Sequence, residues 1–459
     1  MLFKSKSPRK HRSLFRRLVR GFLVAGLALM LLLSAMVLWF ARGALYNRFV
    51  YFPKEVAAWE AIRNNRLEVT LDDGWGAYRG NCHSHSHVSH DSDVPFEEIL
   101  AALKSAGNDF IFMTDHVVDN IADYSIQWKG LYDGVLFVRG YEMGYGFLPW
   151  GLPDDTILKR DEEIEVLARQ IRERGGILFF GHTEEERQWD LPELNGMEIY
   201  NLHTDTKDED LWFLPDLLAN ILINNGKYPD QVIRLFFDPQ TEILARWDEL
   251  NKTRRITGIQ GTDAHQNQGF RGVYTAENTF QIWDTSPEML TEFNLNFLTR
   301  TLLRVFFGAF APGDELFHFQ LDPYERVVRY SSTHILAHEL TEAALCESLE
   351  KGRAYVAFDM IADARGFVYL AEDGGRQAVM GEYLPFSESV RLRAAAPNVG
   401  RIKVLRDGAV VHQVDGAALD WRPGAPGNYR IEVELYIVDR WVPWIYSNPI
   451  TLTEGGAPT

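Results

Sequence analysis

The chain has 459 residues and a formal net charge of −17. This length exceeds that of one typical domain, so two or three folded units are expected. Such acidity excludes a broad nucleic-acid-binding surface, which would need a basic stripe to contact phosphates. Its two cysteines, Cys82 and Cys346, are far apart in the sequence and do not make a disulfide framework.

The first forty residues are predicted to anchor the chain in a membrane. Residues 1–20, a basic tail, contain eight of the 47 Lys and Arg residues and no acid, and residues 21–41 are an uncharged, near-continuous apolar run. About twenty apolar residues span the hydrocarbon core and exceed a typical signal-peptide core. The positive-inside rule keeps the tail in the cytoplasm and the remainder outside it, in the periplasm of a Gram-negative cell. A cleaved signal, with a weak site at Ala41–Ala44, is the alternative.

Residues 42–76 are a predicted connector, with a helix over Glu55–Arg66 and a short strand over Leu67–Leu71. From Tyr78 onward, short apolar runs end in histidine or an acid, and helical segments such as Val94–Ser105 and Asp161–Arg174 lie between them. The runs end in His83 and His85, in Asp115 and His116, in Glu142, in His182, in His203, and in Asp263 and His265. Apolar strands that alternate with helices indicate a parallel sheet, whose carboxyl ends meet at one mouth in βα barrels. Six such endings in succession are hard to explain as core packing.

The stretch from Asn81 to Asp91 is the densest part of this pattern. It contains four histidines and one carboxylate, namely His83, His85, His87, His90 and Asp91. Imidazole nitrogens and carboxylate oxygens are the ligands that hold Zn, Mn or Fe. A His-x-His pair at a strand end turns both rings toward one face, because side chains alternate along a strand. Taken alone, the stretch could also be a polar loop.

The remaining residues divide into two predicted parts. Residues 281–365 are expected to be a helical extension, with helices over Pro287–Gly308 and Thr333–Lys351. His334 and His338 lack the order of a zinc-protease helix, so a surface helix is the better interpretation there. Residues 366–454 contain short alternating runs separated by Gly, Pro and Asp, which is typical of a small antiparallel β-sandwich.

Taken in order, these motifs resemble the PHP (polymerase and histidinol phosphatase) superfamily of metal-dependent hydrolases over residues 77–280. The motifs are His83-x-His85, His90, Thr114-Asp-His116, Gly140-Tyr-Glu142, Gly181-His182, His203 and Gly261-Thr-Asp263-Ala-His265. With the ending Trp444-Ile-Tyr-Ser-Asn-Pro-Ile450, the chain is most similar to the branch that includes carbaryl-type hydrolases. The resemblance implies a distorted (βα)7 TIM-like barrel with three divalent metals, Zn, Mn or Fe, at the carboxyl ends of its strands.

The resemblance also implies a ligand set. His83, His85 and Asp263 would hold one metal, and Glu142 would bridge it to a second metal held by His182 and His203. A third metal would take His90, His116 and His265. The family often has Asp where His90 stands, so Asp91 is the alternative ligand, and Asn81 stands where the family commonly has Asp. Asp115 is either an orienter of a ligand imidazole or a helix cap.

These ligands predict hydrolysis, with Glu142, Asp263 and His182 as catalytic residues. A water shared between close divalent ions has a lowered pKa, so hydroxide is available near neutral pH without a nucleophilic side chain. We therefore expect a membrane-anchored, extracytoplasmic phosphoesterase that acts on a small molecule and not on nucleic acid. Substrate choice is expected in the loops after the strands, chiefly Val117–Lys129, Tyr145–Thr156 and Thr183–Leu194.

Two other functions remain open. The same site could hydrolyse a carbamate, amide or aryl ester, because few basic residues (Arg139, Arg187 and Arg271) stand near the motifs to bind a phosphate. A non-catalytic metal-binding or scaffold module is the alternative of another class. The sequence leaves the oligomeric state open.

Overall fold

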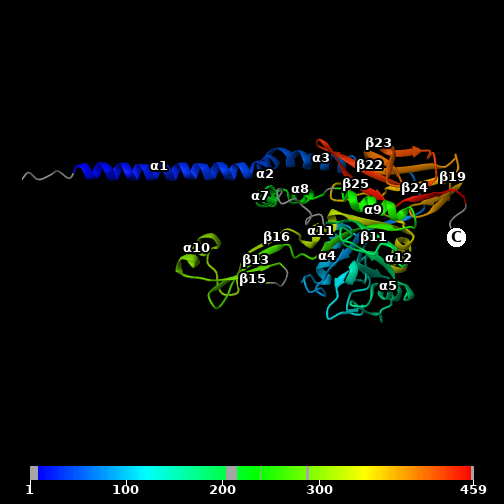
Figure 1. The fold of residues 1–459 in the computed structure, drawn as a ribbon, viewed down its shortest axis with the longest axis horizontal. Helices are drawn as coiled ribbons and strands as arrows, with labels where there is room; N and C mark the ends of the chain where they lie inside the picture. The colour runs from blue at the N-terminus through cyan, green and yellow to red at the C-terminus, as the bar shows by residue number, and fades with distance from the viewer. Residues whose placement is uncertain (1–8, 203–213, 238, 286–288, 456–459) are drawn as a thin grey trace, which may run out of the picture. The chain divides into compact units, whose positions relative to one another are not determined.

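The structure is a computed structural model that describes residues 9–202, 214–237, 239–285 and 289–455 (Figure 1). The chain forms two compact units, residues 1–57 with 209–236, and residues 58–208 with 237–459. The fold is mixed α/β with one 18-stranded sheet.

The smaller unit is helical in its described part. Its helices are α1 (Arg9–Phe40), α2 (Arg42–Tyr46), the π-helical turn η1 (Asn47–Tyr51), the start of α3 (Phe52–Asn64), α7 (Leu214–Asn224) and α8 (Pro229–Arg234). Residues Arg16–Phe40 of α1 are long and apolar enough to cross a membrane, a test that a signal sequence also passes.

The predicted strand Leu67–Leu71 is wrong, since these largely exposed residues have no regular secondary structure and pair with no other strand.

Parallel strands form the frame of the larger unit. In pairing order they are β10 (Ile177–Phe180), β11 (Gly196–Asn201), β12 (Thr257–Ala264), β1 (Gly76–Ser84), β2 (Phe110–Phe112) and β6 (Val135–Val138). The short strands β3 (Asp115–His116) and β7 (Tyr141–Glu142) follow β2 and β6 and also pair in parallel. Because these strands run in one direction, the predicted site residues at their carboxyl ends lie at one edge.

Antiparallel strands and helices flank this frame. The strands are β8 (Phe147–Trp150), which pairs with β10, β5 (Gly130–Tyr132), which pairs with β6, and β4 (Ile121–Asp123), which pairs with β9 (Ile157–Lys159). The helices are α4 (Phe96–Ala106), the 3-10 turn η2 (Gly144–Gly146), α5 (Ile164–Glu173) and α9 (Thr241–Asn251). The predicted helix over Val94–Ser105 is confirmed as α4, and Gly107 ends it in the left-handed conformation with φ of 72°.

Residues 269–320 form a four-stranded antiparallel sheet and one helix. The strands are β13 (Gly269–Tyr274), β14 (Thr279–Asp284), β15 (Met289–Asn294) and β16 (Glu315–Gln320), and the helix is α10 (Phe297–Phe307). Only the second half of the predicted helix Pro287–Gly308 is therefore helical. Residues Met289–Asn294 within this range pair instead with β14, and Phe293 stands opposite Phe280. The periodicity of one segment does not record its pairing with another.

The predicted helix Thr333–Lys351 is also only half correct. Residues Ser332–Ala337 form β17, which pairs antiparallel with β1 and with β18 (Ala354–Ala357), while α11 (Tyr324–Tyr330) precedes it and α12 (Glu342–Glu350) follows. His334, expected on a surface helix, is fully buried. All six residues of β17 are buried, so the run lacks polar alternation and its periodicity does not distinguish a strand from a helix.

The C-terminal region is built of strands, as predicted. They are β19 (Val368–Asp373), β20 (Arg376–Val379), β21 (Tyr383–Pro385), β22 (Arg391–Arg406), β23 (Ala409–Trp421), β24 (Gly427–Ile437), β25 (Arg440–Ser447) and β26 (Ile450–Thr453). All their pairings are antiparallel except that of β21 with β26. The pairing of β25 with β18 makes these strands part of the 18-stranded sheet.

Candidate metal centre

The carboxyl-terminal edge of the parallel strands brings most of the predicted site residues together. His83 and His85 stand at the end of β1, His116 ends β3, Glu142 ends β7, His182 follows β10, Asp263 stands near the end of β12, and His265 follows that strand. His83, His182 and Asp263 have left-handed φ angles of 63°, 48° and 50°. This conformation costs a non-glycine residue about 1–3 kcal/mol, and such strain concentrates at functional sites.

A first group of side chains could hold a metal ion. His83, Glu142, His182 and Asp263 each offer a ligand atom, and these atoms lie within 4.8 Å of one another. His83 Nε2 is 3.3 Å from Glu142 Oε2 and 3.2 Å from Asp263 Oδ1. His182 Nε2 is 3.2 Å from Glu142 Oε1.

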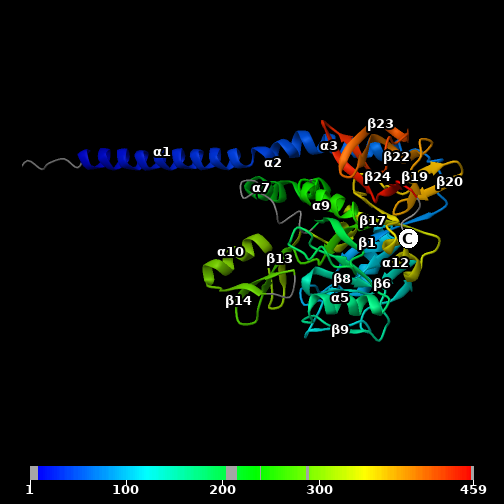
Figure 2. The ribbon, with the colours of Figure 1, turned by 45° about the vertical axis from the view of Figure 1, so that its right-hand side comes forward.

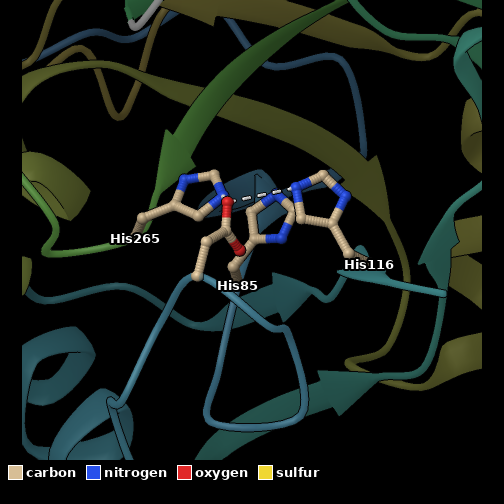
Figure 3. A group of neighbouring side chains, drawn as sticks. His85, His116 and His265 are labelled. Atoms are coloured by element: carbon tan, nitrogen blue, oxygen red, sulfur yellow. Dashed lines mark ion pairs between the residues drawn. The ribbon is translucent and has the colours of Figure 1, made fainter. Parts of the chain in front are cut away.

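A second group adjoins the first and consists of His85, Asp91, His116 and His265. Figure 3 shows the imidazole rings of His85, His116 and His265 gathered together. Asp91 Oδ2 is 3.4 Å from His116 Nε2 and 3.3 Å from His265 Nε2. The rings of His85 and His265 stack with centroids 3.8 Å apart.

Glu142 and Asp263 connect the two groups. Glu142 Oε2 is also 3.4 Å from His116 Nδ1 and 3.6 Å from His85 Nε2. Asp263 Oδ1 is 3.1 Å from His85 Nε2 and 3.4 Å from His265 Nδ1. Because a carboxylate has two oxygens, each of these side chains can serve two neighbouring ions.

The spacing of these atoms fits divalent metal ions. Ligands about 2.0–2.2 Å from one ion are about 2.8–3.6 Å from one another in tetrahedral or octahedral geometry. The nitrogen–oxygen separations within and between the groups fall mostly in that range, as in the 3.1 Å between His85 and Asp263. Among the described residues, the buried Nε2 of His85 makes no hydrogen bond. A buried imidazole nitrogen that faces the carboxylates of Glu142 and Asp263 is well placed to bind a metal ion.

Hydrogen bonds to Nδ1 orient three of these imidazoles. His83 Nδ1 is 2.6 Å from Glu198 Oε1, and His265 Nδ1 is 2.8 Å from the backbone oxygen of Asp263. Both partners only accept hydrogen bonds, so Nδ1 carries a proton and Nε2 is the nitrogen that faces the centre and can bind metal once deprotonated. His85 Nδ1 is 3.0 Å from Ser89 Oγ, which donates to Asp115 and therefore accepts from the imidazole.

The sequence analysis missed Glu198, on β11. Its carboxylate accepts hydrogen bonds from His83 Nδ1, from the backbone N–H of His182 at 2.9 Å and from Asn201 Nδ2 at 2.9 Å. A Cβ atom at Gly261 would lie 2.0 Å from Glu198 Oε1, so glycine is needed there. The available signal was that Glu198 is a lone acid within the predicted apolar strand Gly196–His203.

Asp115 supports the centre without joining either group. Its buried carboxylate accepts hydrogen bonds from the Ser86 backbone N–H at 2.5 Å, from Gln127 Nε2 at 2.7 Å and from Ser89 Oγ at 3.2 Å. It thus holds the turn that follows β1 and orients His85 through Ser89. These contacts favour the orienting interpretation of Asp115 over the helix cap.

The charges in the centre shift the pKa values of its groups. Burial opposes the charged form of His83, but the carboxylates of Glu198, Asp263 and Glu142 raise its pKa well above the usual value. Burial likewise opposes protonation of His182 and His265, yet nearby carboxylates raise their pKa values to about 10 and about 9. Burial and the neighbouring histidines hold the pKa of His85 well below its usual value. Without metal, imidazolium groups therefore balance the carboxylates.

The other predicted residues lie elsewhere. His90 is exposed and belongs to neither group, although its ring centroid is 5.0 Å from that of His116. His203 lies outside the described residues. Arg139 donates to the backbone oxygen of Gln127, and Arg187 donates to that of Gly181 and pairs with Glu185.

The chain is similar to solved structures but not to known sequence families. No protein-family model matches the chain, and no curated protein matches it. The chain is similar to the crystal structure of a two-domain protein containing a predicted PHP-like metal-dependent phosphoesterase from Bacteroides vulgatus ATCC 8482. The sequence identity is 14%, the match covers 84% of this chain and 98% of that chain, and the TM-score is 0.37. At this similarity, the chain's own residues must carry the functional conclusion.

Proposed function

We propose that this chain is a metal-dependent hydrolase of the PHP type that cleaves phosphoesters. One observation carries the proposal, namely the two adjoining groups of histidines and carboxylates that Glu142 and Asp263 connect. The resemblance of the ordered motifs, which contain most of these residues, to PHP hydrolases also supports it. The run of parallel pairings from β10 to β6, with β8 joined to β10 and an isolated bridge from Gly140 to Trp150, supports the distorted (βα)7 barrel.

The proposed ligands divide between two ions. The first ion is assigned to His83, His182, Glu142 and Asp263, and the second to His85, Asp91, His116 and His265. Asp91 replaces His90 in this proposal because its carboxylate lies between His116 and His265. The resemblance implies three ions and assigns His203 to one of them together with His182 and Glu142. We propose that an ion additional to these two would need His203, which lies outside the described residues.

The proposed metal ligands differ in their exposure to solvent. The side chains of His83 and His85 are fully buried, whereas those of His182 and His116 are 17% and 26% exposed. Substrate would therefore approach beside His182 and His116, while Glu198 and Ser89 hold the rings behind them. Divalent ions bound there would lower the pKa of a coordinated water and neutralise the charge that develops on a phosphoryl oxygen.

The location of the enzyme follows from α1. We propose that Arg16–Phe40 spans the membrane with the basic tail in the cytoplasm, which leaves the catalytic unit outside the cytoplasm. The mass of the mature chain tests this, because cleavage near residue 44 would remove the anchor and support a signal sequence instead.

A second candidate is hydrolysis of a carbamate, amide or aryl ester at the same centre. A groove of about 540 Å³ next to His116 is lined by apolar side chains that include Val118, Ile121 and Ile126, and by no Lys or Arg among the described residues. Arg139 and Arg187 already bind backbone oxygens. This surface suits an uncharged, partly apolar group better than a second phosphate.

Metal content and substrate screening test both candidates. Full-length protein purified in detergent without added metal should contain two or three equivalents of Zn, Mn or Fe by elemental analysis. Aryl phosphates and matched aryl carbamates should then distinguish the two bonds by relative kcat/KM. A folded, metal-free protein that takes up no metal on titration would contradict the hydrolase proposal. Bound metal without turnover of either substrate class would favour a non-catalytic module.

A further inference from the structure

Helix α10 exposes a wide apolar face. Phe297 is 89% exposed, Leu298 66%, Val305 74% and Phe306 78%, and no residue of the helix is buried. At 100° per residue, these side chains and Leu302 occupy about half of the helix circumference. On the neighbouring strand β15, Met289, Leu290 and Phe293 are 45–52% exposed. Soluble monomers rarely leave so wide an apolar helix face in water.

The opposite side of α10 holds the helix on its own sheet. The rings of Phe307 and Phe317 are 6.0 Å apart, and the Arg300 guanidinium lies 5.5 Å from the ring centroid of Tyr274 on β13. Figure 2 shows α10 next to β13 and β14. The exposed face is therefore the side that the sheet does not cover, and its residues do not contribute to the core.

The charge of the segment that contains α10 is unlike that of the chain as a whole. Residues 293–313 contain Arg300 and Arg304 and no Asp or Glu, although the whole chain has a net charge of −17. A basic helix with a Phe- and Leu-rich face is the composition of helices that lie in a membrane interface and bind anionic lipid. The same chain contains Arg16–Phe40, which can cross a membrane.

We propose that α10 lies in the head-group region of a bilayer that contains anionic lipid, with Phe297, Leu298, Leu302, Val305 and Phe306 immersed. Its occupant is the lipid surface and not a second copy of the chain, because the helix contains arginine and no acid and the same chain contains a segment that can cross a membrane. This contact is separate from the hydrolase proposal and does not depend on it.

Lipid-quenching of a fluorophore tests the contact. Full-length protein would carry a thiol-linked environment-sensitive probe at F306C and be reconstituted in vesicles of phosphatidylcholine and phosphatidylglycerol. Cys82 and Cys346 are 0% and 9% exposed, so the probe should react at the new cysteine, and labelling of the unmodified chain checks this. The matched control is L131C on β5, where Leu131 is 61% exposed.

We expect brominated lipid chains to lower the F306C emission about two-fold or more, and to leave that of L131C unchanged. Quenching should weaken in vesicles without phosphatidylglycerol. A probe at L298C should lose its quenching when V305D is added, with an unchanged melting temperature because Val305 is exposed. Equal emission of F306C with and without brominated lipid overturns the proposal, as does F306C–F306C crosslinking without lipid quenching, which would identify a second copy as the occupant.

Discussion

Strand β1 carries a buried cluster of charged and histidine side chains near each end, and the two clusters differ in their source of positive charge. Near its start, Arg79 Nε is 3.1 Å from Asp359 Oδ2, and His334 Nε2 is 3.0 Å from the same oxygen. At its end, His83 and His85 face Glu142 and Asp263. Both clusters combine histidine with carboxylate, so residue types alone do not separate them.

The difference teaches how to distinguish a structural cluster from a metal centre. Arg79 is a permanent cation, and together with His334 it holds the pKa of Asp359 below the usual range although burial alone would raise it. At the other end, every ion pair that Glu142 forms in the described part of the chain is with a histidine. Such carboxylates depend on protons or on metal ions for their neutralisation, whereas Asp359 does not.

The largest expected effect is at the metal centre. Glu142→Gln removes the charge that connects both groups, so bound metal should be lost and kcat/KM should fall about a thousand-fold or more. Elemental analysis and steady-state kinetics measure the two effects. Glu185→Gln is the control, because its side chain is exposed and pairs with Arg187. Full metal content in Glu142→Gln would contradict the proposed ligand set.

The matched change at the other cluster should act on stability alone. Asp359→Asn leaves Arg79 buried without its carboxylate, which should lower the free energy of unfolding by about 3–5 kcal/mol. Metal content per folded chain should be unchanged. Chemical denaturation measures the loss, with Asp363→Asn, a more exposed partner of Arg365, as the control. A loss of metal with no loss of stability would reverse the assignment of the two clusters.

An intermediate effect is expected from Glu198, which holds His83 from behind. Glu198→Gln can keep the contact to Nδ1 while losing the negative charge, so metal affinity should weaken about 10- to 100-fold. Competition with a chelator measures this affinity. Glu186→Gln, on an exposed position after β10, should leave it unchanged. Equal affinities in the two variants would show that Glu198 does not tune the centre.

The smallest effect is a dependence of metal binding on pH. The pKa values of His182 and His265 are raised to about 10 and about 9, so both are protonated at neutral pH in the metal-free protein. Metal must displace these protons, so affinity should rise with pH through this range and binding at pH 7 should release protons. Calorimetry in buffers of different ionisation enthalpy counts them. Binding without proton release would mean that these imidazoles are already neutral.

Stability at low pH should separate the clusters in the same way. The pKa of Asp359 is lower in the folded chain than in the unfolded one, so its contribution is present above the ordinary Asp pKa and is lost as the pH falls below it. In Asp359→Asn this part of the acid sensitivity should be absent. An acid titration of the melting temperature compares the two chains.

The sequence by itself determined the strand–helix frame and the residues that could bind metal. Apolar runs that end in His83, His116, Glu142 and His182 are local patterns, and parallel strands bring their carboxyl ends to one edge whatever the connecting loops do. The apolar segment after the basic tail was equally readable, because its length and lack of charge are local properties. The strands of the C-terminal region were also marked by alternation and by Gly and Pro between them.

Only the tertiary structure decided which of these groups meet. Asp91 joins His116 and His265, whereas His90 is exposed and belongs to neither group, and adjacent residues in a turn cannot be separated by composition. Glu198, on β11, contacts His83, although the two residues are 115 positions apart in the sequence. His334 is buried because β17 pairs with β1. The strand β15 likewise forms through its pairing with β14. Contacts between separate strands and loops stabilise each of these arrangements, and the periodicity of a single segment contains no record of them.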